Sequence, residues 1–355
     1  MLLVIFGITM IRSAVAGNID VAGYDQRQLN FALFGFAVMF IVASIDYHYW
    51  SSVSKGMYIV AAVSLAVLNV VATAVFGSAR WFNLLIVNVQ PSEIAKIVVI
   101  LVLADYFTRN QDRISDPRFV IRSFLWMMGI TVWIILQPNL STSIVMVVIW
   151  FALLWAGGLR IKHLLLFTLT GITAVAVSFP ALVKFEIIKE YQLLRITNFL
   201  FPDQNATYGD NYNILQAIIA IGSGGLFGQG YGHGSQVQLR FLKVRWSDFI
   251  FSAMAQEFGF IGTVLVMLIV LFVVYRCLRA ARLSRDTYGA LICYGVAALI
   301  AFQAMVNIGV NLNLIPATGL TLPFVSYGGS SLVTNSVAIG LVQSVILRHR
   351  ALEFE

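Results

Sequence analysis

The residues of this chain best suited to chemistry are ionisable side chains within, or at the edge of, long apolar runs. Burying a charge in a lipid-like environment costs several kcal/mol unless the charge is paired or hydrated. Such residues therefore indicate places where a substrate, an ion or a partner side chain offsets that cost. Four of them stand out: Glu93, Lys96, Asp248 and Glu257.

Asp248 follows a basic segment and opens an apolar run. Arg240, Lys243 and Arg245 precede it, whereas no residue of opposite charge is adjacent within the run that it opens. A carboxylate beside several cations suits the abstraction of a proton next to an anionic substrate. A carboxylate at a helix start is also favoured by the helix dipole alone. Both interpretations of Asp248 stay open on these residues.

Glu93 and Lys96 are separated by three positions, so a helix places them on one face. They predict either an ion pair that neutralises both charges or a pair that contacts a substrate. Glu257 lies deeper in the run opened by Asp248, and it fits either a structural hydrogen bond or a site residue.

The composition places the chain among the membrane proteins. Its 355 residues are 59% hydrophobic and 11% charged, with a mean hydropathy of +0.87, whereas about a quarter of the residues in soluble domains are charged. We predict an all-α polytopic protein of about ten transmembrane helices, because roughly 20 apolar residues cross a bilayer. The ten runs are Met1 to Ala16, Leu29 to Ile45, Met57 to Val75, Ile94 to Phe107, Phe124 to Leu136, Thr142 to Ala156, Leu164 to Phe179, Phe249 to Tyr275, Tyr288 to Val306 and Leu332 to Leu347.

The distribution of Lys and Arg predicts the orientation. Short loops rich in these residues stay cytoplasmic, and one alternating set of loops holds most of them, including residues 109–122 and 276–285. We therefore predict cytoplasmic termini and a long outer loop, residues 183–247, between spans seven and eight. The chain is interpreted as one domain, residues 1–355, that contains this loop. A cleaved signal peptide is not expected, because no charged segment precedes the first run.

Three segments of the outer loop have patterns of their own. Tyr191 to Pro202 and Tyr212 to Ile221 have helical apolar spacing, which predicts short helices at the outer membrane interface or simple packing over the span ends. Residues 222–234 are rich in glycine but follow no predicted strand. This pattern favours a flexible, closely packed loop over a nucleotide cradle.

Several function classes lack their usual sequence support. The chain has no GxxxxGK[ST], no HExxH and no GxGxxG with an acidic ribose contact, which argues against ATP-driven, metalloprotease and dinucleotide chemistry. Cys277 and Cys293 are too few for a metal cluster or a disulfide framework, so we interpret them as small core residues. The net charge of +7 comes mostly from the predicted cytoplasmic loops, which suits an anionic leaflet better than nucleic acid.

Residues 307–331, NIGVNLNLIPATGLTLPFVSYGGSS, form a polar run between two apolar ones. Pro316 and Pro323 end any helix that enters, and the run contains no charge. Irregular backbone at membrane depth persists only where protein covers it or water fills a cavity. We therefore predict a re-entrant or surface-lining loop.

Four separated motifs, in order along the chain, resemble those of the SEDS family (shape, elongation, division, sporulation), to which RodA and FtsW belong. The first is ARWFNLLIVNVQPSEIAK, residues 79–96, and the second is QPNLST, residues 137–142, which has Asn139 and Ser141 in place of the Asp and Gly of the family's QPDLGT. The third joins IGSGGLFGQG, residues 221–230, to FLKVRWSDFIFSAMAQEFGFIG, residues 241–262, and the fourth is the run 307–331.

The third motif departs from the common FLPE.HTDFIF..LAEE pattern but keeps its acidic residues Asp248 and Glu257. The departures are Lys243, Val244, Trp246, Ser247 and Gln256. The family's His and one of its Glu residues are therefore absent here.

The resemblance implies a peptidoglycan glycosyltransferase that polymerises lipid II on the outer face of the bacterial cytoplasmic membrane, together with a class B penicillin-binding protein. It implies Asp248 as the base that takes a proton from the attacking sugar hydroxyl. The short tail ending at Glu355 favours the RodA branch, which serves cell elongation and shape. No cofactor is expected with certainty, and a divalent cation, Mg²⁺ or Mn²⁺, is left open. The substrate-binding candidates are Lys96, Glu93, Arg195, Arg240, Arg245, Glu257, Ser326 and Ser330.

Two other classes remain open on the sequence. The enzyme would need a lipid-facing groove for the polyprenyl tail and a charged cavity that contains Asp248, Glu93 and Lys96, and a lipid II flippase would use both without needing a base. A membrane scaffold that recruits synthases would need neither a substrate site nor a base. Glycan polymer made from lipid II by the purified protein distinguishes the enzyme from both.

Overall fold

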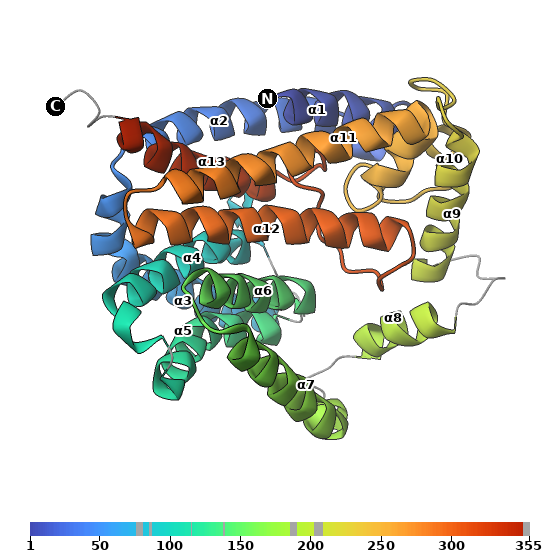
Figure 1. Cartoon of the computed structure of the whole chain (residues 1–355). Coiled ribbons are helices and arrows are strands. Elements are labelled where there is room, and N and C mark those ends of the chain that lie inside the picture. Colours follow the sequence, from blue (N-terminus) through green and yellow to red (C-terminus); the bar gives the residue numbers. More distant parts are fainter. Residues whose placement is uncertain are drawn as a thin grey trace. The chain divides into compact units, whose positions relative to one another are not determined.

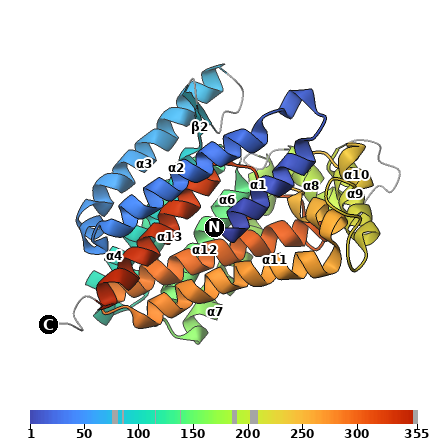
Figure 2. The same cartoon turned by 90° about the horizontal axis from the view of Figure 1, so that it is seen from above.

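The computed structural model describes residues 1–75, 81–84, 87–114, 116–137, 139–184, 190–201 and 209–350. The described chain is almost entirely helical (Figures 1 and 2). It divides into two compact units: residues 1–36, 190–274 and 300–335 form the first, and residues 37–189, 275–299 and 336–355 form the second. The assignment of one domain to residues 1–355 stays a prediction.

The first unit gathers distant parts of the sequence. Within it, the short helix α10 lies against α9, and α8 also contacts α9 (Figure 1). Helices α2, α11, α12 and α13 each contribute residues to both units. The elements with residues in the first unit are α1 (Leu2–Val15), η1 (Ile19–Val21), α2 (Tyr24–Ser44), α8 (Glu190–Leu200), α9 (Gly209–Gly224), α10 (Ser235–Gln238), α11 (Ile250–Leu283), α12 (Thr287–Asn311) and α13 (Gly329–Arg350).

The second unit is built around α4, which packs against α3, α5 and α6. Strands β1 and β2 form an antiparallel hairpin in which Phe82 pairs with Val89. The elements that belong to this unit alone are α3 (Tyr47–Val75), β1 (Phe82–Leu84), β2 (Val87–Val89), α4 (Pro91–Arg109), η2 (Gln111–Arg113), α5 (Pro117–Leu136), α6 (Leu140–Ala156) and α7 (Ile161–Lys184).

Local sequence signals explain where the helices of the second unit begin. Pro91 and Pro117 occupy first-turn positions of α4 and α5, where the missing N–H of proline costs nothing. Asp116 caps α5 by accepting from the N–H of Arg118 at 2.9 Å. Asn139 caps α6 by accepting from the N–H of Thr142 at 3.3 Å, so the Asn that replaces the motif's usual Asp still provides a capping oxygen.

Each of the ten predicted apolar runs lies in a helix. Among the described residues, six helices are long and apolar enough to cross a membrane: α2, α3, α5, α11, α12 and α13. Helices α1 and α6 are apolar but shorter, and α4 carries Glu93, Lys96, Asp105 and Arg109. Membrane crossing by these three and by α7 therefore stays a prediction, as does the count of ten.

The two predicted helices of the outer loop are present as α8 and α9. The eighth predicted run, in contrast, is not one regular helix. Gly259 interrupts α11 with φ 68° and ψ −167°, a conformation that glycine adopts without the steric cost of a side chain. The predicted apolar run from Phe249 to Tyr275 therefore contains a local break in its helix, which apolar length alone does not reveal.

Candidate active site

Asp248 lies in an irregular segment just before α11, rather than inside the helix, whose first residue is Ile250. Its main-chain carbonyl accepts two hydrogen bonds, from Nδ2 of Asn307 at 3.1 Å and from Nδ2 of Asn311 at 2.9 Å. Both asparagines are buried, and they lie one turn apart on α12. The backbone of Asp248 is therefore held by side chains that are shielded from solvent.

Asn311 also fixes the first turn of α11. Oδ1 of Asn311 accepts from the N–H of Ser252 at 3.0 Å and from its hydroxyl at 2.6 Å. One buried amide thus binds Asp248 through its donor end and Ser252 through its acceptor end. This uses both halves of the group, which is how a buried amide avoids a desolvation penalty.

The loop between α12 and α13 supports the residues next to Asp248. The hydroxyl of Ser326 donates to the carbonyl of Ser247 at 2.8 Å, and the N–H of Tyr327 donates to the carbonyl of Trp246 at 2.8 Å. Gly319 has φ 75°, and a Cβ built there would lie 3.7 Å from Oδ2 of Asp248. Within the run 307–331, residues 312–328 form a loop that packs against the candidate base, whereas its first five residues belong to α12 and its last three to α13. The re-entrant or surface-lining interpretation stays a prediction.

Residues at the start of α2 pack against this loop, and they belong to the same unit. The ring of Tyr24 stacks on that of Tyr327, with centroids 4.4 Å apart, and meets the ring of Trp246 edge-on at 5.9 Å. Gln28 is buried, donates to the carbonyl of Ser326 at 3.2 Å and accepts from the N–H of Gly328 at 3.2 Å. These contacts lock the loop in place.

Asp248 as a whole residue is partly exposed, and the hydroxyl of Ser247 donates to Oδ1 of its carboxylate at 2.9 Å. A base needs such access, because it must reach the proton that it removes. The fixed backbone and the partial exposure of the residue together form an arrangement suited to proton transfer.

Arg245 is a buried cation three positions before Asp248, with 3% of its surface exposed. Its guanidinium lies 5.6 Å from the ring centroid of Trp246 and donates to the carbonyl of Leu242 at 3.4 Å, while its Nε has no hydrogen-bond partner in the described structure. Burial lowers the pKa of Arg245, and the charge of Arg240 lowers it further. An anion reaching Arg245 would offset both effects. Arg240 itself is exposed and donates to the carbonyl of Gly17.

Glu257 lies at the break in α11 and contacts α1. The hydroxyl of Ser13 donates to its Oε1, and Oε2 has no partner among the described residues. The glycine-rich loop supplies backbone partners at this break: the N–H of Gly230 donates to the carbonyl of Glu257 at 3.0 Å. These contacts favour the structural interpretation of Glu257, and they show the close packing predicted for the glycine-rich segment.

Glu93 and Lys96 form an ion pair on α4 at 2.7 Å, with side chains that are 9% and 1% exposed. The predicted shared helix face is confirmed. Glu93 keeps one oxygen, Oε2, without a partner in the described structure. Lys96 belongs to the second unit and Asp248 to the first, so a cavity shared by the two residues stays a prediction.

The structure gives positions for the remaining candidates, Arg195 and Ser330, and their place in one site with Asp248 stays a prediction. Arg195 lies on α8, and Ser330 is in the first turn of α13. Sequence reasoning missed Asn311, Gln28 and Tyr24 as site residues. The spacing of Asn307 and Asn311 in an apolar helix was a usable signal, whereas Tyr24 and Gln28 act through tertiary contacts that no local pattern reveals.

The described residues do not offer a protein-made metal site. No group of three or more His, Cys, Asp or Glu side chains gathers anywhere in this part of the chain. The divalent cation left open by the sequence therefore has no ligand set among these residues, and no step below depends on it.

The second unit contains an apolar cavity of about 490 Å³ between α3, α4 and the hairpin. Met57 and Val60 of α3, Phe82 of β1, and Ile94 and Val98 of α4 are among its lining residues. Its chemistry suits a hydrocarbon chain rather than a polar ligand.

Comparisons with known proteins identify the family of this chain. A family model described as cell cycle protein, FtsW/RodA/SpoVE, matches residues 1–351. A probable peptidoglycan glycosyltransferase FtsW of Aliivibrio salmonicida is 33% identical, over 90% of this chain and 78% of that protein.

Two solved structures share the fold. A component of a peptidoglycan synthase complex that coordinates polymerisation and crosslinking is 25% identical with a TM-score of 0.80, covering 99% of this chain and 97% of its own. The rod shape determining protein RodA of Thermus thermophilus is 25% identical with a TM-score of 0.71, covering 98% and 94%. The chain therefore belongs to the FtsW/RodA/SpoVE family, the SEDS family that its motifs resemble.

Proposed function

We propose that this protein is a peptidoglycan glycosyltransferase that polymerises lipid II at the outer face of the bacterial cytoplasmic membrane. The observation that carries the proposal is Asp248, a partly exposed residue whose main-chain carbonyl is fixed by two buried asparagines. Membership of the family supports the enzyme class, because relatives carry the name peptidoglycan glycosyltransferase.

In the proposed reaction, Asp248 removes the proton from an acceptor sugar hydroxyl as that oxygen attacks the anomeric carbon of the donor. The bond between the anomeric carbon and the pyrophosphate oxygen breaks, and undecaprenyl pyrophosphate leaves with the negative charge. The proton on Asp248 then passes to water. Positioned general bases contribute about 100-fold or more to such rates.

Cations hold the leaving group as its charge grows, and electrostatic stabilisation of this kind is usually a large catalytic term. Arg245 is the strongest candidate, because it is buried and its Nε has no described partner. Lys96, Arg195 and Arg240 complete the proposed set. The apolar cavity between α3 and α4 is the proposed binding site of the polyprenyl chain.

The orientation, the biological branch and the partner are parts of the same proposal. The Lys and Arg distribution supports cytoplasmic termini. The proposed role in elongation rests on the structural similarity to RodA. The sequence relative compared above carries the name FtsW instead. A class B penicillin-binding protein is the proposed partner, since a structural relative belongs to a complex that both polymerises and crosslinks.

The test is polymerisation of purified lipid II by the detergent-solubilised protein, with its penicillin-binding partner present. Asp248→Asn should lower the rate about 100-fold or more while expression, membrane insertion and partner binding persist. Asp20→Asn is the matched control, because Asp20 is an exposed carboxylate of the same unit. If Asp248→Asn retains a rate within a few-fold of the parent, the catalytic assignment fails and the flippase and scaffold interpretations regain weight.

A further inference from the structure

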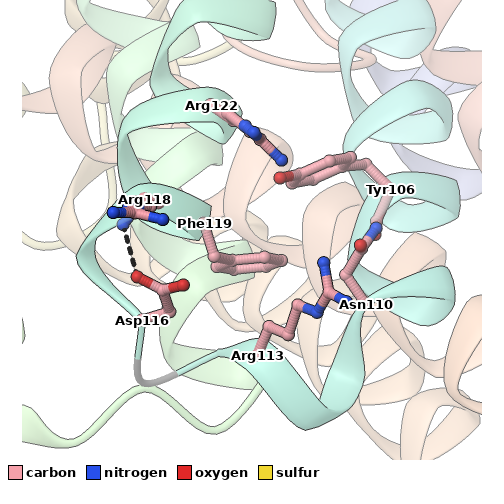
Figure 3. A pocket seen from close by; sticks show the side chains of 7 residues that line it. All are labelled: Tyr106, Asn110, Arg113, Asp116, Arg118, Phe119 and Arg122. Atoms are coloured by element: carbon pink, nitrogen blue, oxygen red, sulfur yellow. Dashed lines mark hydrogen bonds between the residues drawn. The ribbon is translucent and has the colours of Figure 1, made fainter.

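A second polar site lies within the second unit, where α4 ends and α5 begins. The pocket at this site has a volume of about 110 Å³, and its lining includes Tyr106 of α4, Asn110 just after α4, Arg113 of η2, and Arg118 and Arg122 of α5. A cavity needs a volume of roughly 10–15 Å³ to hold one water molecule. The pocket therefore has room for a group of several heavy atoms. In Figure 3, the ring of Phe119 lies between Arg122 and Arg113.

The charge in this pocket is strongly positive. Three guanidinium groups line it, together with one carboxylate, that of Asp116. That carboxylate caps α5 through the N–H of Arg118 at 2.9 Å. None of the three guanidinium groups forms an ion pair or a side-chain hydrogen bond with any residue that the structure describes.

The neighbouring Arg109 shows the contrast. It is the last residue of α4 and forms an ion pair with Asp105 at 2.9 Å. The arginines of the pocket have no such internal partner in the described structure. A ligand with several anionic oxygens would therefore find unused donors, and guanidinium matches the geometry of phosphate oxygens well.

Aromatic residues give the pocket a fixed wall. The rings of Tyr106 and Phe119 stack with centroids 5.1 Å apart, and Phe119 also packs on the buried Phe107 at 5.0 Å. The hydroxyl of Tyr106 points toward Arg122 across the pocket (Figure 3). It adds a neutral donor beside Arg122.

The face of α5 that carries two of the arginines continues as an apolar stripe. Ile121 lies between Arg118 and Arg122, Leu125 and Leu136 follow them on the same face of α5, and the three apolar residues are 55%, 61% and 55% exposed. α5 is one of the helices long enough to cross a membrane. A cationic pocket at the head of an exposed apolar stripe matches a molecule with an anionic head and a hydrocarbon tail.

We propose that this pocket binds the phosphodiester headgroup of an anionic phospholipid, whose acyl chains lie along the exposed stripe of α5. The basic loop containing residues 109–122 is on the predicted cytoplasmic side, where the leaflet is anionic. A free phosphate would use the arginines but not the stripe, so the stripe favours the lipid. The site lies on groups that the proposed glycosyl transfer does not use.

The experiment counts phospholipids bound to the purified, detergent-solubilised full chain by native mass spectrometry. The probes are phosphatidylglycerol, phosphatidylcholine and the soluble headgroup analogue glycerol phosphate. We expect retention of phosphatidylglycerol over phosphatidylcholine, and roughly tenfold weaker retention in the variant Arg113→Gln/Arg118→Gln/Arg122→Gln, because charge-assisted contacts to phosphate are each worth over 1 kcal/mol.

The matched control is Arg276→Gln/Arg279→Gln/Arg282→Gln, which removes equal charge from exposed arginines of α11 outside the pocket. This variant should retain phosphatidylglycerol like the parent. Equal losses in the two triple variants would show nonspecific attraction and overturn the proposal. If the pocket triple fails to fold, Tyr106→Phe and Arg122→Gln decide the question by the same readout.

The stripe is tested separately with Ile121→Ser/Leu125→Ser. We expect this variant to retain less phosphatidylglycerol while its weak affinity for glycerol phosphate stays unchanged. If glycerol phosphate displaces the lipid at equal concentration, or if the stripe variant binds lipid like the parent, the site is a phosphate site and the lipid proposal is wrong.

Discussion

Asp248 and Glu93 are two carboxylates in apolar surroundings, and the protein stabilises them by different means. Glu93 is buried and neutralised by Lys96 at 2.7 Å. Asp248 is held through its main-chain carbonyl by Asn307 and Asn311, and the residue as a whole stays partly exposed. The charge of Glu93 is balanced by an adjacent cation, whereas the contacts described above for Asp248 are hydrogen bonds to its main-chain carbonyl and to Oδ1. The two carboxylates are therefore held by different kinds of contact.

The largest expected effect on stability comes from breaking the ion pair. Lys96→Met leaves Glu93 buried without a counter-charge, which typically costs about 3–5 kcal/mol. The double variant Glu93→Gln/Lys96→Met should recover most of this stability, because neutral replacements of a buried pair are often tolerated. The measurement is the apparent unfolding temperature of each purified variant.

The same variants separate structure from catalysis. Arg109→Met breaks the more exposed pair with Asp105 and should cost less than about 1 kcal/mol, which makes it the control. If the double variant is stable and still polymerises lipid II slowly at saturating substrate, Lys96 assists pyrophosphate departure. Normal rates in that variant would leave Lys96 a purely structural role.

The second prediction removes the anchor of Asp248. Asn311→Ala deletes the donor to the Asp248 carbonyl and the acceptor for Ser252, leaving buried groups unpaired at about 1–3 kcal/mol. We also expect a rate loss of roughly tenfold, because small misplacements of a catalytic group are costly. Asn69→Ala, which removes donors to Leu65 and Trp133, should lose stability without that loss in rate. Equal rate losses in both variants would argue against a positioning role.

The helices of this protein follow from the sequence more directly than its candidate site does. Apolar runs and helical spacing are local properties, and they predicted a helix at each of the ten runs and at α8 and α9. The pairing of Glu93 with Lys96 also needed only their spacing. The anchoring of Asp248 depends instead on residues 59 and 63 positions away along the chain, and the break at Gly259 depends on the glycine-rich loop. Such contacts exist only once the chain has folded.

The third prediction concerns Gly319, which lies beside the carboxylate of Asp248. Gly319→Ala forces a side chain into a positive φ, at a cost of about 1 kcal/mol, and brings a methyl group to 3.7 Å from Oδ2 of Asp248. Gly23→Ala is the control, since Gly23 has φ 81° and no neighbour within 4 Å. Both variants should lose similar stability. Only Gly319→Ala should slow polymerisation, by a few-fold. If Gly23→Ala slowed it similarly, backbone strain rather than the methyl group beside Asp248 would explain the slower rate.

The smallest effect is expected at Glu257, the second acidic residue that the third motif retains. Glu257→Gln keeps the volume and an oxygen that accepts from Ser13, so we expect a stability change within about 1 kcal/mol and a rate within a few-fold of the parent. Ser13→Ala should do more harm to stability, because it leaves a buried carboxylate oxygen without its donor. The two variants are compared by apparent unfolding temperature and by lipid II polymerisation. A loss of about 100-fold in Glu257→Gln, with its stability intact, would be the signature of a proton-transferring group. Glu257 would then share the chemistry assigned to Asp248, and its contact with Ser13 would be a means of orienting an active carboxylate.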